Sequence, residues 1–120
     1  MSDQQLINKK RWSRERRSQR IDLTVPVVVH RPQKGGSQFY ERAQTLVVNA
    51  HGALIALAEK VTPSQRLFMQ NINSGEQKEC RVVYVEKGVA GPTKVAVEFT
   101  RPAPSFWRIA YPPADWTASA

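Results

Sequence analysis

The densest group of chemically active side chains is an arginine cluster near the start of the chain, Arg16-Arg17-Ser18-Gln19-Arg20. A guanidinium group binds phosphate through two parallel N–H donors and stacks on aromatic bases, which the ammonium group of lysine does not do. Arg16 and Arg20 lie close enough in sequence to reach one small dianion. The cluster therefore indicates either a site for a phosphorylated ligand or a solubilising, nonspecific basic tail.

The remaining reactive side chains do not form a catalytic set. Cys80 falls on the apolar face of an expected strand, which is typical of a small buried side chain. His51, beside Gly52, is typical of a solvated turn residue, and Glu76 and Glu79 are typical of surface charges. The sequence contains no phosphate-binding glycine loop or nucleophile motif, and it has too few cysteines and histidines for a structural zinc site. We therefore expect no enzyme, no bound metal and no cofactor.

The positive charge is concentrated at one end of the chain. The 120 residues carry a net charge of +8, which favours anionic partners. Residues 1–20 hold seven basic and two acidic residues with few apolar ones, so they cannot bury a face of their own. We expect a flexible basic arm over residues 1–20, which carries the arginine motif, and one globular domain over residues 21–120.

The composition also bears on the compartment. No apolar run approaches the roughly 20 residues of a membrane span, and the N-terminus lacks the apolar run of a secretory signal. The single cysteine, Cys80, permits no internal disulfide and is compatible with a reducing environment. These features predict a cytoplasmic protein without a membrane span.

Short segments of β-branched and alternating residues dominate the globular part. They predict six strands, over residues 21–29, 39–48, 53–57, 65–69, 79–85 and 95–99. Pro26 removes a hydrogen-bond donor, so we expect an edge or a bulge at that position. Only residues 105–110 look helical, and Pro112-Pro113 should end that helix. The predicted fold is all-β, a six-stranded antiparallel barrel with a basic N-terminal arm and a short C-terminal helix.

The order of the motifs is informative. Arg16, Arg17 and Arg20 stand directly before the expected barrel, and a strand-turn-strand segment, Val47-Val48-Asn49-Ala50-His51-Gly52, follows the first strand. This arrangement resembles the PilZ domain family, with its N-terminal arginine motif and its second motif, Asp/Asn-x-Ser-x-x-Gly. Residues 95–99 look like the family's late strand ending in Phe, so the resemblance covers nearly the whole chain.

The resemblance implies a bacterial second-messenger receptor that binds cyclic di-GMP and changes a surface that a downstream protein reads. It implies that Arg16, Arg17 and Arg20 wrap over the ligand, and that Asn49 and Gly52 contact it from the barrel. His51 and Val47 are then adjacent to the ligand.

The second motif departs from the family pattern at two positions. Val47 stands where the family has Asp or Asn, and valine can neither donate nor accept a hydrogen bond. Losing that contact to guanine weakens binding by about ten- to hundredfold. Asn49 replaces Ser but keeps an amide that can donate and accept, and only Gly52 matches the pattern.

Two other functions remain open at this point. A PilZ-fold adaptor that has lost nucleotide binding would act through protein contacts, with Trp107, Tyr111 and Trp116 either docking a partner or packing back onto the barrel. A nonspecific nucleic-acid-binding barrel would bind through phosphate contacts alone and depend strongly on salt. The expected strands do not interleave aromatic and basic residues as a stacking platform requires, so nucleic acid is the less favoured partner.

Overall fold

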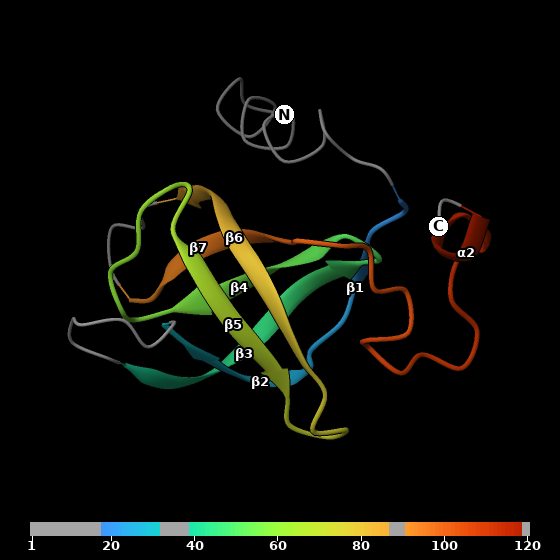
Figure 1. Cartoon of the computed structure of the whole chain (residues 1–120), viewed down its shortest axis with the longest axis horizontal. Helices are drawn as coiled ribbons and strands as arrows, with labels where there is room; N and C mark the ends of the chain where they lie inside the picture. The colour runs from blue at the N-terminus through green and yellow to red at the C-terminus, as the bar shows by residue number, and fades with distance from the viewer. Residues whose placement is uncertain (1–17, 32–38, 87–90, 119–120) are drawn as a thin grey trace.

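The computed structural model describes residues 18–31, 39–86 and 91–118, and the elements in these ranges are nearly all strands (Figure 1). Arg16 and Arg17 therefore lie outside the described residues, as does most of the predicted arm. The strands are β1 (Ile21–Asp22), β2 (Pro26–His30), β3 (Tyr40–Asn49), β4 (Gly52–Leu57), β5 (Arg66–Asn71), β6 (Gln77–Glu86) and β7 (Thr93–Phe99). One short helix, α2 (Ala114–Ala118), follows them.

Six of the strands form a closed barrel. Their order is β3-β2-β5-β6-β7-β4, and the antiparallel pairing of β3 with β4 closes the ring. Among the described strands, β1 pairs with β3 alone, so it is a short addition to the barrel. The architecture confirms the six-stranded antiparallel barrel predicted from the sequence.

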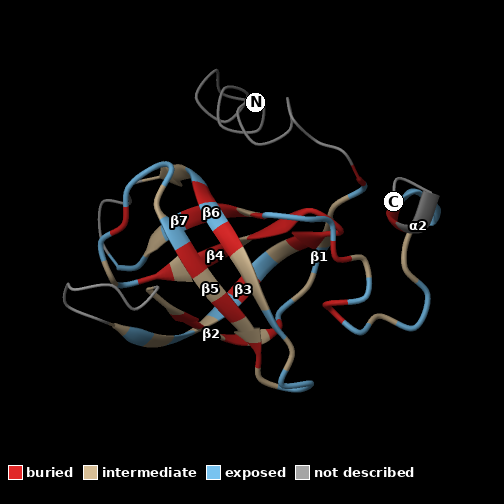
Figure 2. Ribbon diagram, in the orientation of Figure 1, coloured by how far each residue is buried: buried red, intermediate tan, exposed pale blue. Residues whose placement is uncertain are grey.

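Alternation along the strands builds the core. In β2, Val27 and Val29 are fully buried, whereas Val28 and His30 are half-buried on the outer surface. Figure 2 shows the same alternation of buried and more exposed residues along the neighbouring strands. Because successive side chains of a strand point to opposite faces, the β-branched pattern fixes which face turns inward.

A break separates β1 from β2 at the place where the sequence predicted an edge or a bulge. Pro26 lacks an N–H group and is the first residue of β2, a position that a proline tolerates. The side chain of buried Thr45 bridges the break: its Oγ1 accepts from the Val25 N–H at 2.8 Å and donates to the Leu23 carbonyl at 2.6 Å. The backbone groups at the break therefore keep hydrogen-bond partners.

The prediction of a helix over residues 105–110 is wrong. This segment forms tight turns, with the Phe106 N–H donating to the Ala103 carbonyl at 3.1 Å and the Arg108 N–H donating to the Ser105 carbonyl at 3.1 Å. Arg108 has a φ of 57°, a left-handed conformation that ends the turns. The short C-terminal helix lies at α2 instead, directly after Pro112-Pro113, because the fixed φ of proline suits a helix start.

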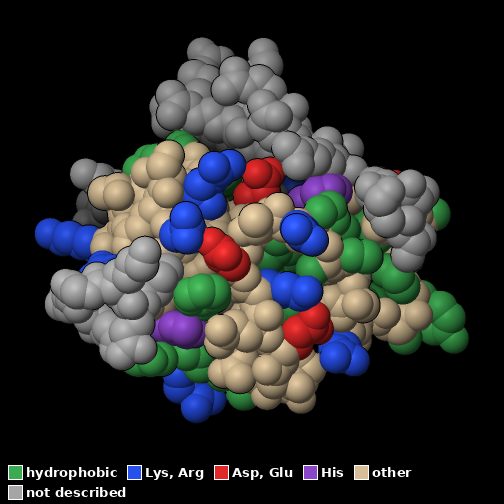
Figure 3. Space-filling view, in the orientation of Figure 1, with side chains coloured by type: hydrophobic (Ala, Val, Ile, Leu, Met, Phe, Trp, Pro, Cys, Tyr) green, Lys and Arg blue, Asp and Glu red, His purple; other side chains and the backbone are tan. Residues whose placement is uncertain are grey.

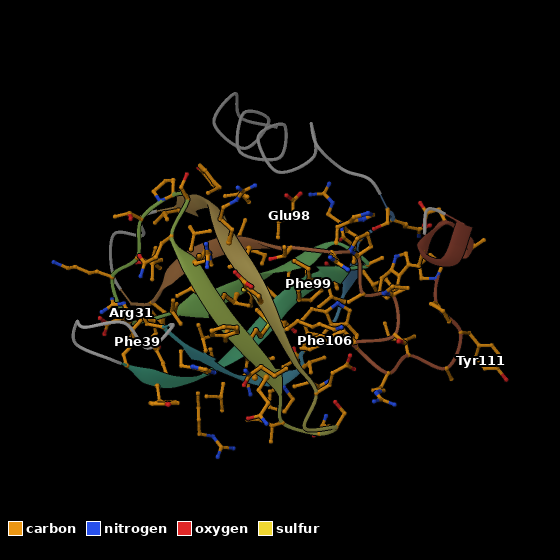
Figure 4. The ribbon with its side chains drawn as sticks, viewed as in Figure 1. Arg31, Phe39, Glu98, Phe99, Phe106 and Tyr111 are labelled. Atoms are coloured by element: carbon orange, nitrogen blue, oxygen red, sulfur yellow. The ribbon has the colours of Figure 1, made fainter. Side chains whose placement is uncertain are left out.

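The turn over residues 103–108 closes one end of the barrel with aromatic rings. Phe106 and Trp107 are 0% and 3% exposed, and their ring centroids lie 5.0 and 5.8 Å from that of Phe99 (Figure 4). The rings bury a large apolar area at the end of the barrel where β3 turns into β4. No helix within the described ranges is long and apolar enough to cross a membrane.

Candidate ligand-binding site

The described members of the predicted site come together at one end of the barrel. Residues 18–20, here called the arm root, lie between the β3–β4 turn and α2 (Figure 1). The turn carries Asn49, His51 and Gly52, and Arg20 is half-buried in the arm root. The structure thus joins the start of the barrel to the second motif, which is distant in sequence.

Asn49 builds the β3–β4 turn. Its Oδ1 accepts from the backbone N–H groups of His51 at 2.8 Å and Gly52 at 2.9 Å, and its Nδ2 donates to the Ser18 carbonyl at 3.4 Å. Asn favours such turns because its side chain can bond to backbone two or three residues further on. At 5% exposure, the amide predicted to contact a ligand is engaged in holding the turn and the arm root.

Gly52 has a steric role at the start of β4. A Cβ atom at this position would overlap the backbone carbonyl oxygen of Val97 on the neighbouring strand β7. The match of Gly52 to the second motif therefore follows from the close approach of two strands.

Ser18 attaches the arm root to the turn. Its Oγ accepts from the Ala50 N–H at 3.1 Å and lies 3.0 Å from Nδ1 of His51. A hydroxyl group can both donate and accept, so this contact forms with either tautomer of the imidazole. Ser18 is 1% exposed. Sequence reasoning placed this serine in a flexible arm and missed its role, since nothing in the arginine cluster distinguishes it.

His51 is buried, with 7% exposure, so the prediction of a solvated turn residue is wrong. Ser18 covers one side of the imidazole. The backbone of His51 also joins the barrel, because its carbonyl accepts from the Phe99 N–H at 2.7 Å.

The C-terminal helix holds the other side of the arm root. The Asp115 carboxylate accepts from the Gln19 N–H at 3.0 and 3.2 Å, and the Trp116 indole N–H donates to the Gln19 carbonyl at 2.6 Å. Both polar backbone groups of Gln19 are therefore bonded to α2. Sequence reasoning did not identify Asp115, and it named Trp116 without its bond to Gln19, because these contacts join residues 96 and 97 positions apart.

The aromatic residues near the C-terminus divide into two groups. Trp107 is buried and donates its indole N–H to the Asn49 carbonyl at 2.8 Å, and Trp116 is fully buried. These two residues pack back onto the barrel, as one of the two sequence-based interpretations expected. Tyr111, in contrast, is 93% exposed (Figure 4).

Val47 lies on the outward face of β3 beside the turn. It pairs with Asp22 of β1 on one side and with Leu54 of β4 on the other, and all three side chains are at least partly exposed. The register shifts between Thr45 and Val47, which marks a bulge in the β3–β4 pairing. The outward row of residues beside the second motif is therefore an aspartate, a valine and a leucine.

The barrel surface carries charges of both signs. Figure 3 shows Lys and Arg interspersed with Asp and Glu on the visible face. Glu76 and Glu79, predicted as surface charges, take part in ion pairs, including Arg66–Glu79 at 3.0 Å and Arg108–Glu76 at 3.6 Å. The described barrel is therefore not a uniformly basic surface, which agrees with the concentration of charge in residues 1–20.

Similar proteins are found by structure alone. No protein-family model and no curated protein sequence matches the chain. The structure of the Bacillus subtilis inhibitor of motility MotI/DgrA is similar, with a TM-score of 0.60 and 15% identity over 78% of this chain. The chain spans about half of that protein's length, covering 48% of it.

A second similar structure is the PilZ domain of CeSA from a cellulose-synthesizing bacterium. It has a TM-score of 0.52 and 18% identity, over 70% of this chain and 82% of that domain. At such identities the likeness concerns the fold. Together with the closed barrel, it shows that the chain has a PilZ-like fold.

Proposed function

We propose that this PilZ-like domain binds cyclic di-GMP between its N-terminal arm and the β3–β4 turn. The observation that supports this function is the attachment of the arm root, in which Ser18 bonds to Asn49 and Ala50 across 31 and 32 positions of sequence. Arg17 directly precedes Ser18 in the sequence, and Arg20 belongs to the arm root itself. The arginine motif and the second motif can therefore contact one ligand.

The fixed arm root favours binding by lowering its entropic cost. Ordering a free segment on a ligand consumes part of the interaction energy. Here residues 18 and 19 are already held by the β3–β4 turn and α2, so a ligand that contacts this segment has less chain to order. Each charge-assisted hydrogen bond to phosphate contributes about 1.5–3 kcal/mol, and each stack of arginine on a base about 0.5–2 kcal/mol.

The proposed output is a change of surface rather than catalysis. A ligand that orders the arm over the barrel would create a surface for an unidentified downstream protein. The arm root is bonded to α2, so ordering of the arm also affects the C-terminal segment, which exposes Tyr111. One of the similar structures is an inhibitor of motility, which fits a regulatory role for this fold.

Isothermal titration calorimetry tests the proposal. Cyclic di-GMP, GTP and a single-stranded DNA are titrated separately into the full chain, each at low and at moderate salt. We expect saturable binding of cyclic di-GMP that persists at moderate salt, because stacking and bidentate contacts are less screened than a diffuse charge. Absence of heat with cyclic di-GMP at tens of micromolar protein would contradict the proposal.

An adaptor that does not bind the nucleotide is the second candidate function. Val47 favours it, because its side chain lies on the outward face where the resemblance implies a guanine contact and offers no polar atom. The same calorimetry distinguishes the two functions, since an adaptor gives no heat with any of the three ligands.

Nonspecific binding of nucleic acid has weaker support. The described barrel has a row of outward rings in which His30 stacks between Tyr40 and Phe68, with centroid distances of 5.0 and 5.3 Å. The two faces of His30 are therefore covered by its neighbours, so this ring is not open to stack on a base as the rings of a stacking platform are.

A further inference from the structure

Asp22 is the acidic residue nearest to Val47 in the sheet. The two residues are paired across the antiparallel strands β1 and β3, so their side chains project from the same face. Directly opposed residues have Cβ atoms about 4.5–5.5 Å apart. The carboxylate of Asp22 therefore lies within one side-chain length of the position occupied by Val47.

The Asp22 carboxylate is available to a ligand. The side chain is exposed, and among the described residues it has neither a hydrogen bond nor an ion pair. Asp22 also stands two residues after Arg20, on the segment that the arm root holds against the β3–β4 turn. The carboxylate of Asp22 and the guanidinium of Arg20 thus belong to the same short stretch of chain.

A guanine base presents groups that suit this pair. Its O6 and N7 atoms accept hydrogen bonds and are bound well by arginine, while its N1–H and N2–H₂ groups donate. A carboxylate accepts both donors at once, since it has two oxygens and no proton to give. Adenine has an unprotonated N1 and no amino group at C2, so a carboxylate repels its corresponding edge.

We propose that Asp22 is the residue by which this domain recognises guanine, so that the acceptor absent from Val47 is supplied from the neighbouring strand. This inference rests on the proposed function and assigns its base specificity. Asp22 acts from β1, one strand away from the second motif, and its contact selects cyclic di-GMP over cyclic di-AMP.

Glu98 is the other carboxylate near the second motif, but its surroundings differ. Glu98, labelled in Figure 4, pairs with Gly52 on one side and with Arg81 on the other, so a basic residue is its partner across the sheet. It belongs to β7, which is separated from β3 by β4. Glu98 therefore serves as the matched control for Asp22.

The test measures the affinities of four full-length proteins for cyclic di-GMP and cyclic di-AMP by calorimetry. We expect Asp22→Val to weaken cyclic di-GMP binding about ten- to hundredfold, the loss that one unpaired polar contact causes. Glu98→Gln should bind like the unaltered chain. The double variant Asp22→Val with Val47→Asp moves the carboxylate across one strand pair, and it should recover most of the lost affinity.

The outcomes separate this inference from the proposed function. If the unaltered chain binds cyclic di-GMP and Asp22→Val binds it equally well, the role of Asp22 is overturned while the proposed function stands. The role of Asp22 is also overturned if Glu98→Gln weakens the binding of cyclic di-GMP and Asp22→Val does not. If the unaltered chain binds no cyclic di-GMP, the proposed function and this inference both fail. Thermal unfolding of Asp22→Val should match that of the unaltered chain, since the side chain is exposed.

Discussion

The hydroxyl oxygen of Ser18 lies 3.0 Å from Nδ1 of His51 in a buried contact between residues 33 positions apart. The same oxygen accepts from the Ala50 N–H at 3.1 Å, so one serine fixes the arm root to the β3–β4 turn. This attachment gives the basic arm a defined starting point beside the second motif. In the proposed function it places the arginines at the ligand.

Removal of the Ser18 hydroxyl should therefore affect both stability and binding. Ser18→Ala leaves the buried Ala50 N–H without its acceptor, and we expect the free energy of unfolding to fall by about 1–3 kcal/mol in urea denaturation. Cyclic di-GMP should also bind more weakly, because the arm root is less ordered. Ser105→Ala, at an exposed turn position, should change neither quantity. If Ser18→Ala has the same free energy of unfolding as the unaltered chain, the attachment contributes nothing to stability.

Gly52 and Gly75 should respond differently to an added methyl group. Gly52→Ala forces a Cβ against the Val97 carbonyl, so β4 and β7 must separate, and we expect the barrel to lose about 3 kcal/mol of stability. Gly75 has a φ of +80° but open space around it, and Gly75→Ala should lose only about 1 kcal/mol. Chemical denaturation of both variants measures the difference. Equal losses of stability in the two variants would mean that β4 and β7 move apart at little cost to accommodate the added methyl group.

Cys80 should make the stability of the domain decrease at high pH. Burial, with a smaller contribution from the Glu79 carboxylate, raises the pKa of this thiol from 9.0 to about 12. Between these values the unfolded chain releases the thiol proton while the folded chain retains it. The free energy of unfolding therefore falls as the pH rises above 9, by at most about 1.4 kcal/mol per pH unit from this group.

The variant Cys80→Ala isolates that contribution. Its free energy of unfolding should depend less steeply on pH than that of the unaltered chain between pH 9 and 10.5, although the smaller side chain lowers its stability at every pH. Urea denaturation at several pH values measures both slopes. Parallel slopes would indicate that the thiol ionises as readily in the folded chain as in the unfolded one.

The barrel could be predicted because its strands follow a local rule. Alternating β-branched residues such as Val27 and Val29 bury one face of a strand wherever it lies, so strand positions and the antiparallel class follow from the sequence. The helix position could not be predicted in this way. Residues 105–110 look helical in the sequence, yet Phe106 and Trp107 pack on Phe99 from a turn, and only the tertiary contact decides between the two conformations.

The candidate site was less predictable than the fold because its contacts are long-range. The arginine motif and residues 47–52 could be identified by type, but nothing local indicates that Ser18 bonds to Ala50 or that Trp116 bonds to Gln19. The same holds for Asp22, whose pairing with Val47 depends on the register set by the break before Pro26. Residue type indicates the available chemistry, whereas strand register decides which residues share it.

The affinity of Arg17→Ala for cyclic di-GMP, compared with that of Lys9→Ala, tests the central claim most directly. Both variants remove one positive charge from the arm, but only Arg17 adjoins the fixed arm root. We predict saturable binding by the unaltered chain and by Lys9→Ala, and at least a tenfold loss in Arg17→Ala, since about 1.4 kcal/mol corresponds to a factor of ten. Equal affinities in the two variants, or no binding by the unaltered chain, would contradict the account.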